Sequence, residues 1–433
     1  MLKKFTIIIL GLVLCNCSFL QQKSGIDNFG RPQYKYVNNG YPTDMVSSTD
    51  YSQVDLGTTE SYRVAVLLPL SGKLSSMGES MKNAATMAIG DIINNNLVVQ
   101  FYDTKGTPSG ARVALENAIN AGCDLVLGPL TGDEVAAITS EAKSRDIPVI
   151  SFSTSPSVLQ EGIYSIGLLN DEQINRIIRY AAGQGRSRLA LVLPDNQSGI
   201  NMLKSAMKAA NNSGMSVVKV GFYKPDSMDF TDMVVSMKGG FDALLIPESG
   251  NRLKAISSMF SYYDVSAPDV LFMGTSVWAS SNLSKETELY GAVYPVLPLN
   301  RISNFENKYS ELFGERPSGL SIFAYDAVAL ASSLANKDRH YIDEAITRGD
   351  GYYGIGGAFR LFENGRNEHS LDVVKVTSSG EKVVDSAPQK FYGSGYETTG
   401  SATDSYYPSY GFGGMPQFYG KSAAELQSIL SGM

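Results

Sequence analysis

The sequence predicts an α/β fold in two lobes, each built on a doubly wound parallel sheet. Short, continuous apolar runs recur from Tyr62 onward. Such runs are typical of strands that are buried on both faces of a parallel sheet. Between them lie stretches with a 3.6-residue apolar period, and this repeated alternation of strand and helix indicates βαβ units.

The apolar pattern locates the individual elements. Strands are expected at Val64–Leu68, Leu97–Tyr102, Leu125–Leu127, Pro148–Phe152, Leu189–Leu193, Val217–Phe222, Ala243–Ile246 and Val270–Met273. Helical stripes lie within residues 81–92, 174–181, 203–210, 253–260 and 320–331. Gly122, Gly183 and Gly214 stand where helix C-caps belong. Cys123 stands at the entry to the apolar strand Leu125–Leu127, which predicts a small, buried side chain.

These units are too many for one small sheet and fit two lobes joined by hinge crossings. The expected break lies near Leu168–Asp171, where a strand-like segment ends and a new βα series begins. We therefore expect lobe 1 to comprise about 61–168 and 298–352. Lobe 2 would comprise about 169–297 and 353–378, so the chain would return to each lobe.

The N-terminus predicts export. Lys3 and Lys4 precede the apolar run Phe5–Leu14, which is a secretory signal pattern and too short for a membrane span. The segment Leu14-Cys-Asn-Cys17 resembles the bacterial lipobox. That resemblance implies a signal peptide of residues 1–16 and a lipid on Cys17 rather than on Cys15. Ser18 then favours the outer membrane, and the alternative is cleavage to a soluble periplasmic protein.

The segment 17–60 is polar, has no apolar period and predicts a flexible tether. At the other end, residues 379–433 are rich in Tyr, Gly and Ser and predict a tail that is mobile, packs back on the body or binds a partner. Leu426, Ile429 and Leu430 form the stripe of a short terminal helix within it.

Composition excludes several function classes. The formal charge is −7, from 36 basic and 43 acidic residues, so no basic face for nucleic acid is indicated. The chain has two histidines and lacks a phosphate-binding loop, a dinucleotide fingerprint, a zinc-protease motif and a nucleophile elbow. His340 and His369 have the sequence context of surface loops. We expect no enzyme activity, no cofactor and no metal.

Polar loops follow several of the predicted strands. In open α/β sheets, ligands bind beyond the carboxyl ends of the strands. Ser hydroxyls and freed backbone amides at such ends hold small polar groups, although the same residues also cap helices. The candidate ligand-crevice residues are Ser71, Thr131, Ser153, Thr154, Ser198, Glu248 and Ser276.

The motifs at these positions resemble those of type I periplasmic binding proteins over about residues 60 to 376. The matching segments are Val64–Gly72, Ala88–Asp91, Tyr102–Thr104, Leu127–Leu130, Ile147–Ser151 and Phe272–Gly274. The family includes leucine-binding proteins of ABC importers. It also includes the C-terminal domain of penicillin-binding protein activators, outer-membrane lipoproteins that stimulate peptidoglycan synthases. The sequences of Leu67–Gly72 and Gly128–Leu130 are closer to those of the activators.

The sequence departs from both groups. Leucine-binding members hold the ligand ammonium with an acidic residue after the Phe-Met-Gly strand, where this chain has Thr275–Trp278. Their pocket aromatics are replaced by Ser198 and Ser249, and Glu248 is the remaining candidate acid. The helical repeat domain of the activators is replaced by the tether.

Two functions follow from the resemblance. The first is a non-enzymatic periplasmic lipoprotein of the activator type, with a penicillin-binding protein or peptidoglycan synthase as partner. The alternative is the substrate-binding protein of an ABC importer, with a permease and an amino acid or related small solute as partners.

Overall fold

The computed structural model describes residues 61–335, 337, 341–391, 416–421 and 425. The expected signal peptide, Cys17 and the tether lie outside these residues, as do His340 and the helix expected around Leu426. Within the described part of the chain, no helix is both long and apolar enough to cross a bilayer.

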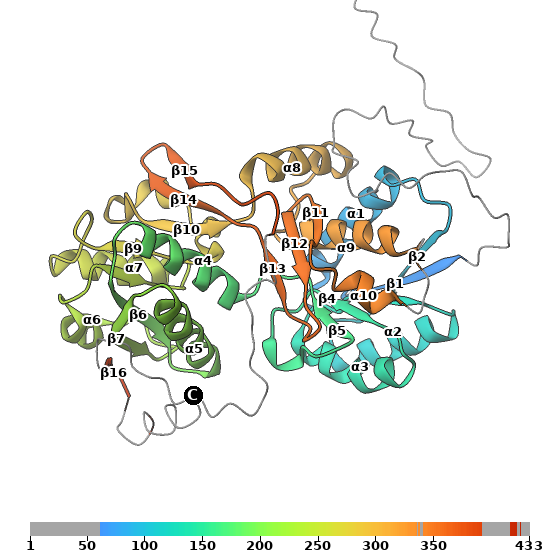
Figure 1. The fold of residues 1–433 in the computed structure, drawn as a ribbon, viewed down its shortest axis with the longest axis horizontal. Helices are drawn as coiled ribbons and strands as arrows, with labels where there is room; N and C mark the ends of the chain where they lie inside the picture. Colours follow the sequence, from blue (N-terminus) through green and yellow to red (C-terminus); the bar gives the residue numbers. More distant parts are fainter. Residues whose placement is uncertain (1–60, 336, 338–340, 392–415, 422–424, 426–433) are drawn as a thin grey trace, which may run out of the picture. The chain divides into compact units, whose positions relative to one another are not determined.

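Lobe 1 contains a five-stranded parallel sheet in the order β2-β1-β3-β4-β5 (Figure 1). Its strands are β1 (Tyr62–Leu68), β2 (Leu97–Asp103), β3 (Leu125–Leu127), β4 (Val149–Ser151) and β5 (Ile163–Ser165). Its helices are α1 (Ser75–Asp91), α2 (Pro108–Asn120), α3 (Gly132–Ser144), α8 (Leu299–Phe313), α9 (Ser321–Leu334) and α10 (Ile342–Ile346). A short 3-10 helix, η1 (Pro156–Val158), follows β4.

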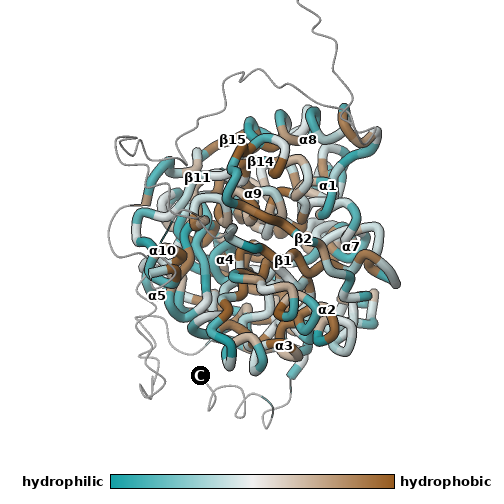
Figure 2. Tube along the Cα trace, turned by 90° about the vertical axis from the view of Figure 1, so that its right-hand side faces the viewer, coloured by the Kyte–Doolittle hydropathy of each residue, from teal (hydrophilic) through white to brown (hydrophobic). Residues whose placement is uncertain are grey.

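Alternation along β1 explains why lobe 1 is doubly wound. Val64, Val66 and Leu68 point into a core shared with α1 and α9. Ala65 and Leu67 point to the opposite face, into a core shared with α2 and α3. Figure 2 shows the resulting hydrophobic segments gathered around β1 and β2. The buried apolar runs were therefore a correct signal for a parallel sheet covered on both faces.

Lobe 2 contains an eight-stranded sheet in the order β15-β14-β10-β9-β8-β6-β7-β16. Its strands are β6 (Arg188–Pro194), β7 (Ser216–Tyr223), β8 (Ala243–Leu245), β9 (Leu271–Met273), β10 (Val293–Val296), β14 (Asp372–Thr377), β15 (Gly380–Asp385) and β16 (Gln417–Tyr419). Its helices are α4 (Asn170–Gly183), α5 (Gln197–Asn212), α6 (Thr231–Met237) and α7 (Gly250–Tyr262), with 3-10 helices η2 (Ser276–Ser280), η3 (Leu283–Lys285) and η4 (Thr287–Leu289). β14 and β15 are antiparallel additions to an otherwise parallel sheet.

All eight strands expected from the sequence are present, each within a residue or two of its predicted bounds. One expected C-cap is wrong. Gly183 is the last residue of α4, and the left-handed turn after that helix is made two residues later by Gly185, with φ of 79°. Gly122 and Gly214 do adopt positive φ, each two residues after the last residue of its helix, α2 or α5.

The return to lobe 2 occurs later than residue 353. An antiparallel sheet of β11 (Tyr352–Gly354), β12 (Gly357–Leu361) and β13 (Asn367–His369) comes first. Phe359, Leu361 and Leu371 belong to the lobe 1 core, so the crossing lies at Leu371–Asp372. The turn between β11 and β12 is fixed by Asp326 of α9, which accepts hydrogen bonds from the backbone N–H groups of Ile355 (2.7 Å) and Gly356 (2.9 Å).

The C-terminal segment is more ordered than the sequence predicts in two places. Residues 380–385 form β15, because a turn after Thr377 pairs them with β14. Residues 417–419 form β16, which adds to the outer edge of the lobe 2 sheet, parallel to β7. Of the alternatives left open for the tail, packing back on the body therefore holds for this short piece.

Candidate ligand-binding site

The lobe 1 candidates lie at one edge of a parallel sheet. Ser71 follows β1, Thr131 follows β3, and Ser153 and Thr154 follow β4. Parallel strands place their carboxyl ends at the same edge, so the topology brings these loops together. The β3 and β4 loops touch, since a Cβ at Gly132 would lie 2.9 Å from Cβ of Ser155.

Two of these hydroxyls hold the loops themselves. Ser71 Oγ donates to Asp103 Oδ2 over 2.6 Å. Thr131 is the N-cap of α3: its Oγ1 accepts the N–H of Glu134, and Glu134 Oε2 accepts the N–H and the hydroxyl of Thr131. Thr131 thus has the capping role that competes with ligand binding, whereas Ser71 ties its loop to the end of β2.

The β4 loop leaves polar atoms available. Ser153 is buried, and its Oγ accepts the N–H of Ser155 over 3.2 Å. Thr154 is exposed, and its hydroxyl makes no hydrogen bond with any described residue. Sequence reasoning missed two more groups at this edge. Ser151 Oγ and Glu134 Oε1 are fully buried and lack a partner in the described structure. Buried polar atoms normally have partners, so these two mark a place for water or a ligand.

The lobe 2 candidates sit at the carboxyl ends of β6, β8 and β9. Ser198 is exposed in the first turn of α5. Ser276 begins η2, and its backbone N–H donates to Gln173 Oε1 over 2.8 Å. Trp278, fully buried, packs against Gly274 and donates from Nε1 to the carbonyl of Ile246 over 2.9 Å. The ends of β8 and β9 are therefore covered by an indole ring.

The two carboxylates at this edge are already compensated. Glu248 Oε1 accepts the phenol of Tyr223, and its Oε2 lies 3.4 Å from Arg252 Nη1. Burial raises the pKa of Tyr223, and the hydrogen bond to Glu248 raises it further, so the phenol stays a donor. Asp195, after β6, forms an ion pair with Lys421, which follows β16. Neither carboxylate is left as the sole counter-charge for a ligand ammonium.

The crossing between the lobes carries buried charges. His369 was expected in a surface loop, and that expectation is wrong. It is 6% exposed on β13, lies against the rings of Phe323 and Phe359, and contacts Glu172 of α4 through its backbone N–H and Nδ1. The His369 side chain points into the core because successive side chains of β13 point to opposite faces of its sheet. The turn residues around this short strand hide that alternation in the sequence. Burial raises the pKa of Glu172, although His369 opposes the shift.

Metal-binding groups, the thiol of Cys123 and two surface hollows are the remaining features to consider. In the residues that the structure describes, no group of three His, Cys, Asp or Glu could hold a metal. Cys123 is half-buried rather than buried, and burial raises the pKa of its thiol to about 11, which keeps it protonated and poorly nucleophilic. Two hollows, of about 350 and 440 Å³, lie away from the crevice loops.

Comparison with known proteins agrees with the fold. Residues 61–381 match the family model described as periplasmic binding protein. A Leu/Ile/Val-binding protein, BraC3 of Rhizobium johnstonii, is 21% identical over 236 residues, covering 50% of this chain and 63% of that protein. Penicillin-binding protein activator LpoA of Mannheimia succiniciproducens is 28% identical over 118 residues, covering 27% of this chain and 19% of that protein.

Solved structures extend the likeness to both lobes. A putative branched-chain amino acid ABC transporter protein from Rhodospirillum rubrum superposes with a TM-score of 0.67 at 16% identity, covering 75% of this chain and all of that one. By contrast, the chain spans about half the length of the curated relatives it matches, from 19% to 63%. The family match covers most of the chain and the lobes have the expected topology: the chain belongs to the periplasmic binding proteins, of type I.

Proposed function

We propose that this protein is a non-enzymatic periplasmic lipoprotein of the activator type, which regulates peptidoglycan synthesis through a penicillin-binding protein or peptidoglycan synthase. It is held by a lipid on Cys17, in the outer membrane. The observation that carries the proposal is the compensation of the two carboxylates that follow β6 and β8, Asp195 and Glu248, by groups of the chain itself.

The argument rests on the cost of burying charge. An amino-acid ligand enclosed between lobes brings an ammonium group, which needs a carboxylate or a complete cage of acceptors. Glu248 is shared between Tyr223 and Arg252, so an ammonium beside it would also face a guanidinium. A leucine-type ligand is therefore disfavoured at this edge, and the fold is left with a role in protein recognition.

The likeness to activator LpoA supports the same role, and the sequence supports the location. The lipobox-like segment before Cys17 and the polar stretch 17–60 are what a body tethered to a membrane requires. Among the described residues, no group of three His, Cys, Asp or Glu could hold a metal.

Thermal melting against an amino-acid panel tests the proposal first. A ligand at a hundredfold excess over Kd stabilises a protein by about 2.7 kcal/mol, so specific binding would raise the melting temperature measurably. We expect no shift with leucine, isoleucine or valine. A purified peptidoglycan synthase should be retained by the immobilised lipoprotein and should gain activity, whereas Cys17→Ser should leave the membrane fraction.

The second candidate is the substrate-binding protein of an ABC importer. It is favoured by the match to Leu/Ile/Val-binding protein BraC3, which covers more of this chain than the activator match does. The unpartnered Ser151 Oγ and the exposed Thr154 at the lobe 1 edge suit a small polar ligand. A clear melting shift with one amino acid, together with no retention of a synthase, would replace the first proposal with this one.

A further inference from the structure

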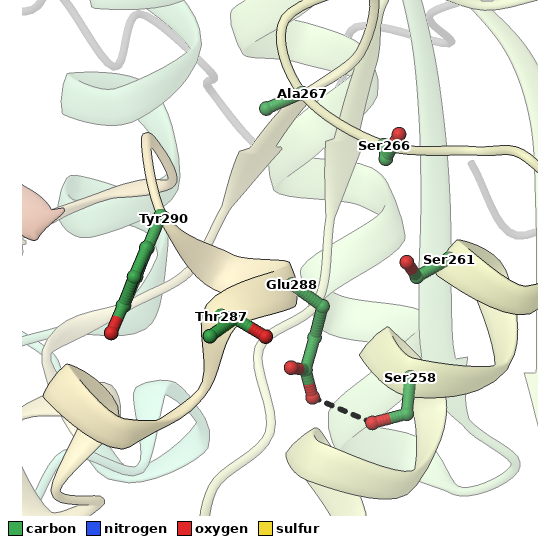
Figure 3. A pocket seen from close by; sticks show the side chains of 7 residues that line it. All are labelled: Ser258, Ser261, Ser266, Ala267, Thr287, Glu288 and Tyr290. Atoms are coloured by element: carbon green, nitrogen blue, oxygen red, sulfur yellow. Dashed lines mark hydrogen bonds between the residues drawn. The ribbon is translucent and has the colours of Figure 1, made fainter. Parts of the chain in front are cut away.

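A hollow of about 350 Å³ lies on lobe 2, away from the crevice loops (Figure 3). It is lined by Ser258, Ser261, Ser266, Ala267, Thr287, Glu288 and Tyr290. The segments that build it are the second half of α7, the loop before β9 and η4 before β10. Because two of these segments lead directly into strands, the hollow lies at the amino ends of β9 and β10, opposite the edge where the candidate crevice loops lie.

Hydroxyl groups dominate the lining. Figure 3 shows the side chains of α7 and η4 facing one another across the hollow. Ser258 Oγ donates to Glu288 Oε1 over 2.6 Å, which fixes the carboxylate. The hydroxyls of Ser261, Ser266 and Thr287 make no hydrogen bond with any described residue. A hydroxyl both donates and accepts, so three of them with one carboxylate match a ligand that carries several hydroxyls of its own.

One aromatic ring lines the hollow, and a second is exposed on the helix that carries Ser258 and Ser261. Tyr290 lines the hollow, and its phenol donates to the carbonyl of Ser284 over 2.8 Å, which holds the ring in place. Tyr262 lies one turn after Ser258 on α7 and is 79% exposed. Its ring packs edge-on against Tyr263 at 5.1 Å, so it is supported. Exposed tyrosines present large, rigid, amphipathic contact surface at small entropic cost.

Charge narrows the class of ligand. Glu288 is the one charged residue of the lining, so a phosphate or carboxylate ligand would meet repulsion. The nearby Lys254 is paired with Glu286 over 2.6 Å. An ammonium ligand would use Glu288 alone in an open, water-filled site, where a single ion pair contributes little. A neutral polyol uses the hydroxyls, the carboxylate and the rings together.

We propose that this hollow binds a neutral sugar, of about one or two residues of a glycan chain. Its volume lies at the low end of the roughly 300–1,000 Å³ seen for small-molecule sites. The site is independent of the crevice and of the proposed function, since it needs neither a synthase nor lobe closure.

Titration of the purified full chain with diacetylchitobiose and with maltose tests the proposal, read out by saturation-transfer NMR and calorimetry. Putrescine serves as the cationic comparator. We expect one disaccharide to bind saturably. Thr287→Val and Ser261→Ala should each weaken it about two- to tenfold, as expected for one lost hydrogen bond. Tyr262→Ala should weaken it similarly, and Ser236→Ala, an exposed hydroxyl of α6 outside the hollow, should change nothing.

Three results would overturn the inference. The first is no saturation by either sugar up to about 10 mM, a concentration above any useful affinity. The second is equal affinity in the wild type and in all hollow variants, which would move the site elsewhere. The third is binding of putrescine in place of sugar, with loss on Glu288→Gln, which would make the hollow a cation site. Unchanged melting of the variants establishes that they are folded.

Discussion

Two buried carboxylates of lobe 1 and two carboxylates at the ligand edge of lobe 2 are held in different ways. In lobe 1, Asp326 and Glu134 are buried and accept hydrogen bonds from backbone N–H groups and a hydroxyl. Neither forms an ion pair with a described residue. In lobe 2, Asp195 and Glu248 are part-exposed and are matched to Lys421 and Arg252. Asp326 shapes a turn and Glu134 caps a helix, whereas the lobe 2 groups occupy the edge where a ligand charge would otherwise bind.

Asp195 also differs from the two lobe 1 carboxylates in the chain distance to its partner. Glu134 is held by Thr131, three residues away, and Asp326 by a turn 29 and 30 residues away. Asp195 is held by a lysine 226 residues further along. The Asp195 end of the lobe 2 edge therefore depends on a C-terminal segment that contacts the body through the short strand β16, its side chains Phe418 and Tyr419, and this ion pair. We expect that edge to be the easier one to loosen.

The largest expected effect is a pH dependence of the free energy of unfolding, contributed by the buried carboxylate of Asp326. Burial raises the pKa of Asp326 to about 6, although the N–H groups of Gly356 and Ile355 oppose the shift. A raised folded-state pKa means that the folded protein binds more protons than the unfolded chain. Its stability therefore falls as pH rises from about 4 to about 6. The shift of about two units corresponds to roughly 3 kcal/mol.

Asp326→Asn removes this titration. Because the variant lacks the falling contribution, the wild-type minus variant free energy of unfolding should decrease by roughly 3 kcal/mol between pH 3 and pH 7, with most of the change between pH 4 and pH 6. Urea unfolding at several pH values measures it, with Asp195→Asn as the matched lobe 2 control. A flat difference would mean that Asp326 does not titrate in this range and that the contrast between the lobes is one of geometry alone.

The second prediction concerns the ion pair between Lys421 and Asp195 at the lobe 2 edge. The side chain of Lys421 is 8% exposed and forms an ion pair with Asp195. Its Nζ lies 3.8 Å from Glu425 Oε1 and 5.3 Å from the centroid of the Phe222 ring. Lys421→Met keeps the apolar stem and removes the charge. We expect a loss of about 1 kcal/mol, the upper range for a part-exposed pair.

Hydrogen exchange localises that loss. The amides of β7 that pair with β16, around Val220, should exchange faster in Lys421→Met, while those of β1 should not change. A double-mutant cycle with Asp195→Asn isolates the pair, since the two losses should then not add. Full additivity would show that the tail is held by its strand pairing and that the ion pair is incidental.

The parts that sequence predicted well are those encoded over short distances. The run Val64–Leu68 alternates between two cores, and that alone indicates a strand covered on both faces. The parts it missed depend on contacts between distant segments. His369 is buried because Glu172 and two aromatic rings meet it, and no local pattern records those partners. The same holds for Lys421 with Asp195, and for Ser71 with Asp103.

The smallest expected effect asks whether Thr131 is a helix cap, a ligand group, or both. Thr131→Ala removes the hydroxyl that accepts the Glu134 N–H and donates to its carboxylate, and should cost about 1 kcal/mol. Thr131→Ser keeps both bonds and should cost much less. Thr139→Ala, which removes a hydroxyl further along the same helix, is the matched control. If the serine variant is as unstable as the alanine variant, the methyl group and not the cap is what matters. In that case the Thr131 hydroxyl would be free to serve a ligand, and the cap at the start of α3 would no longer count among the contacts that stabilise lobe 1.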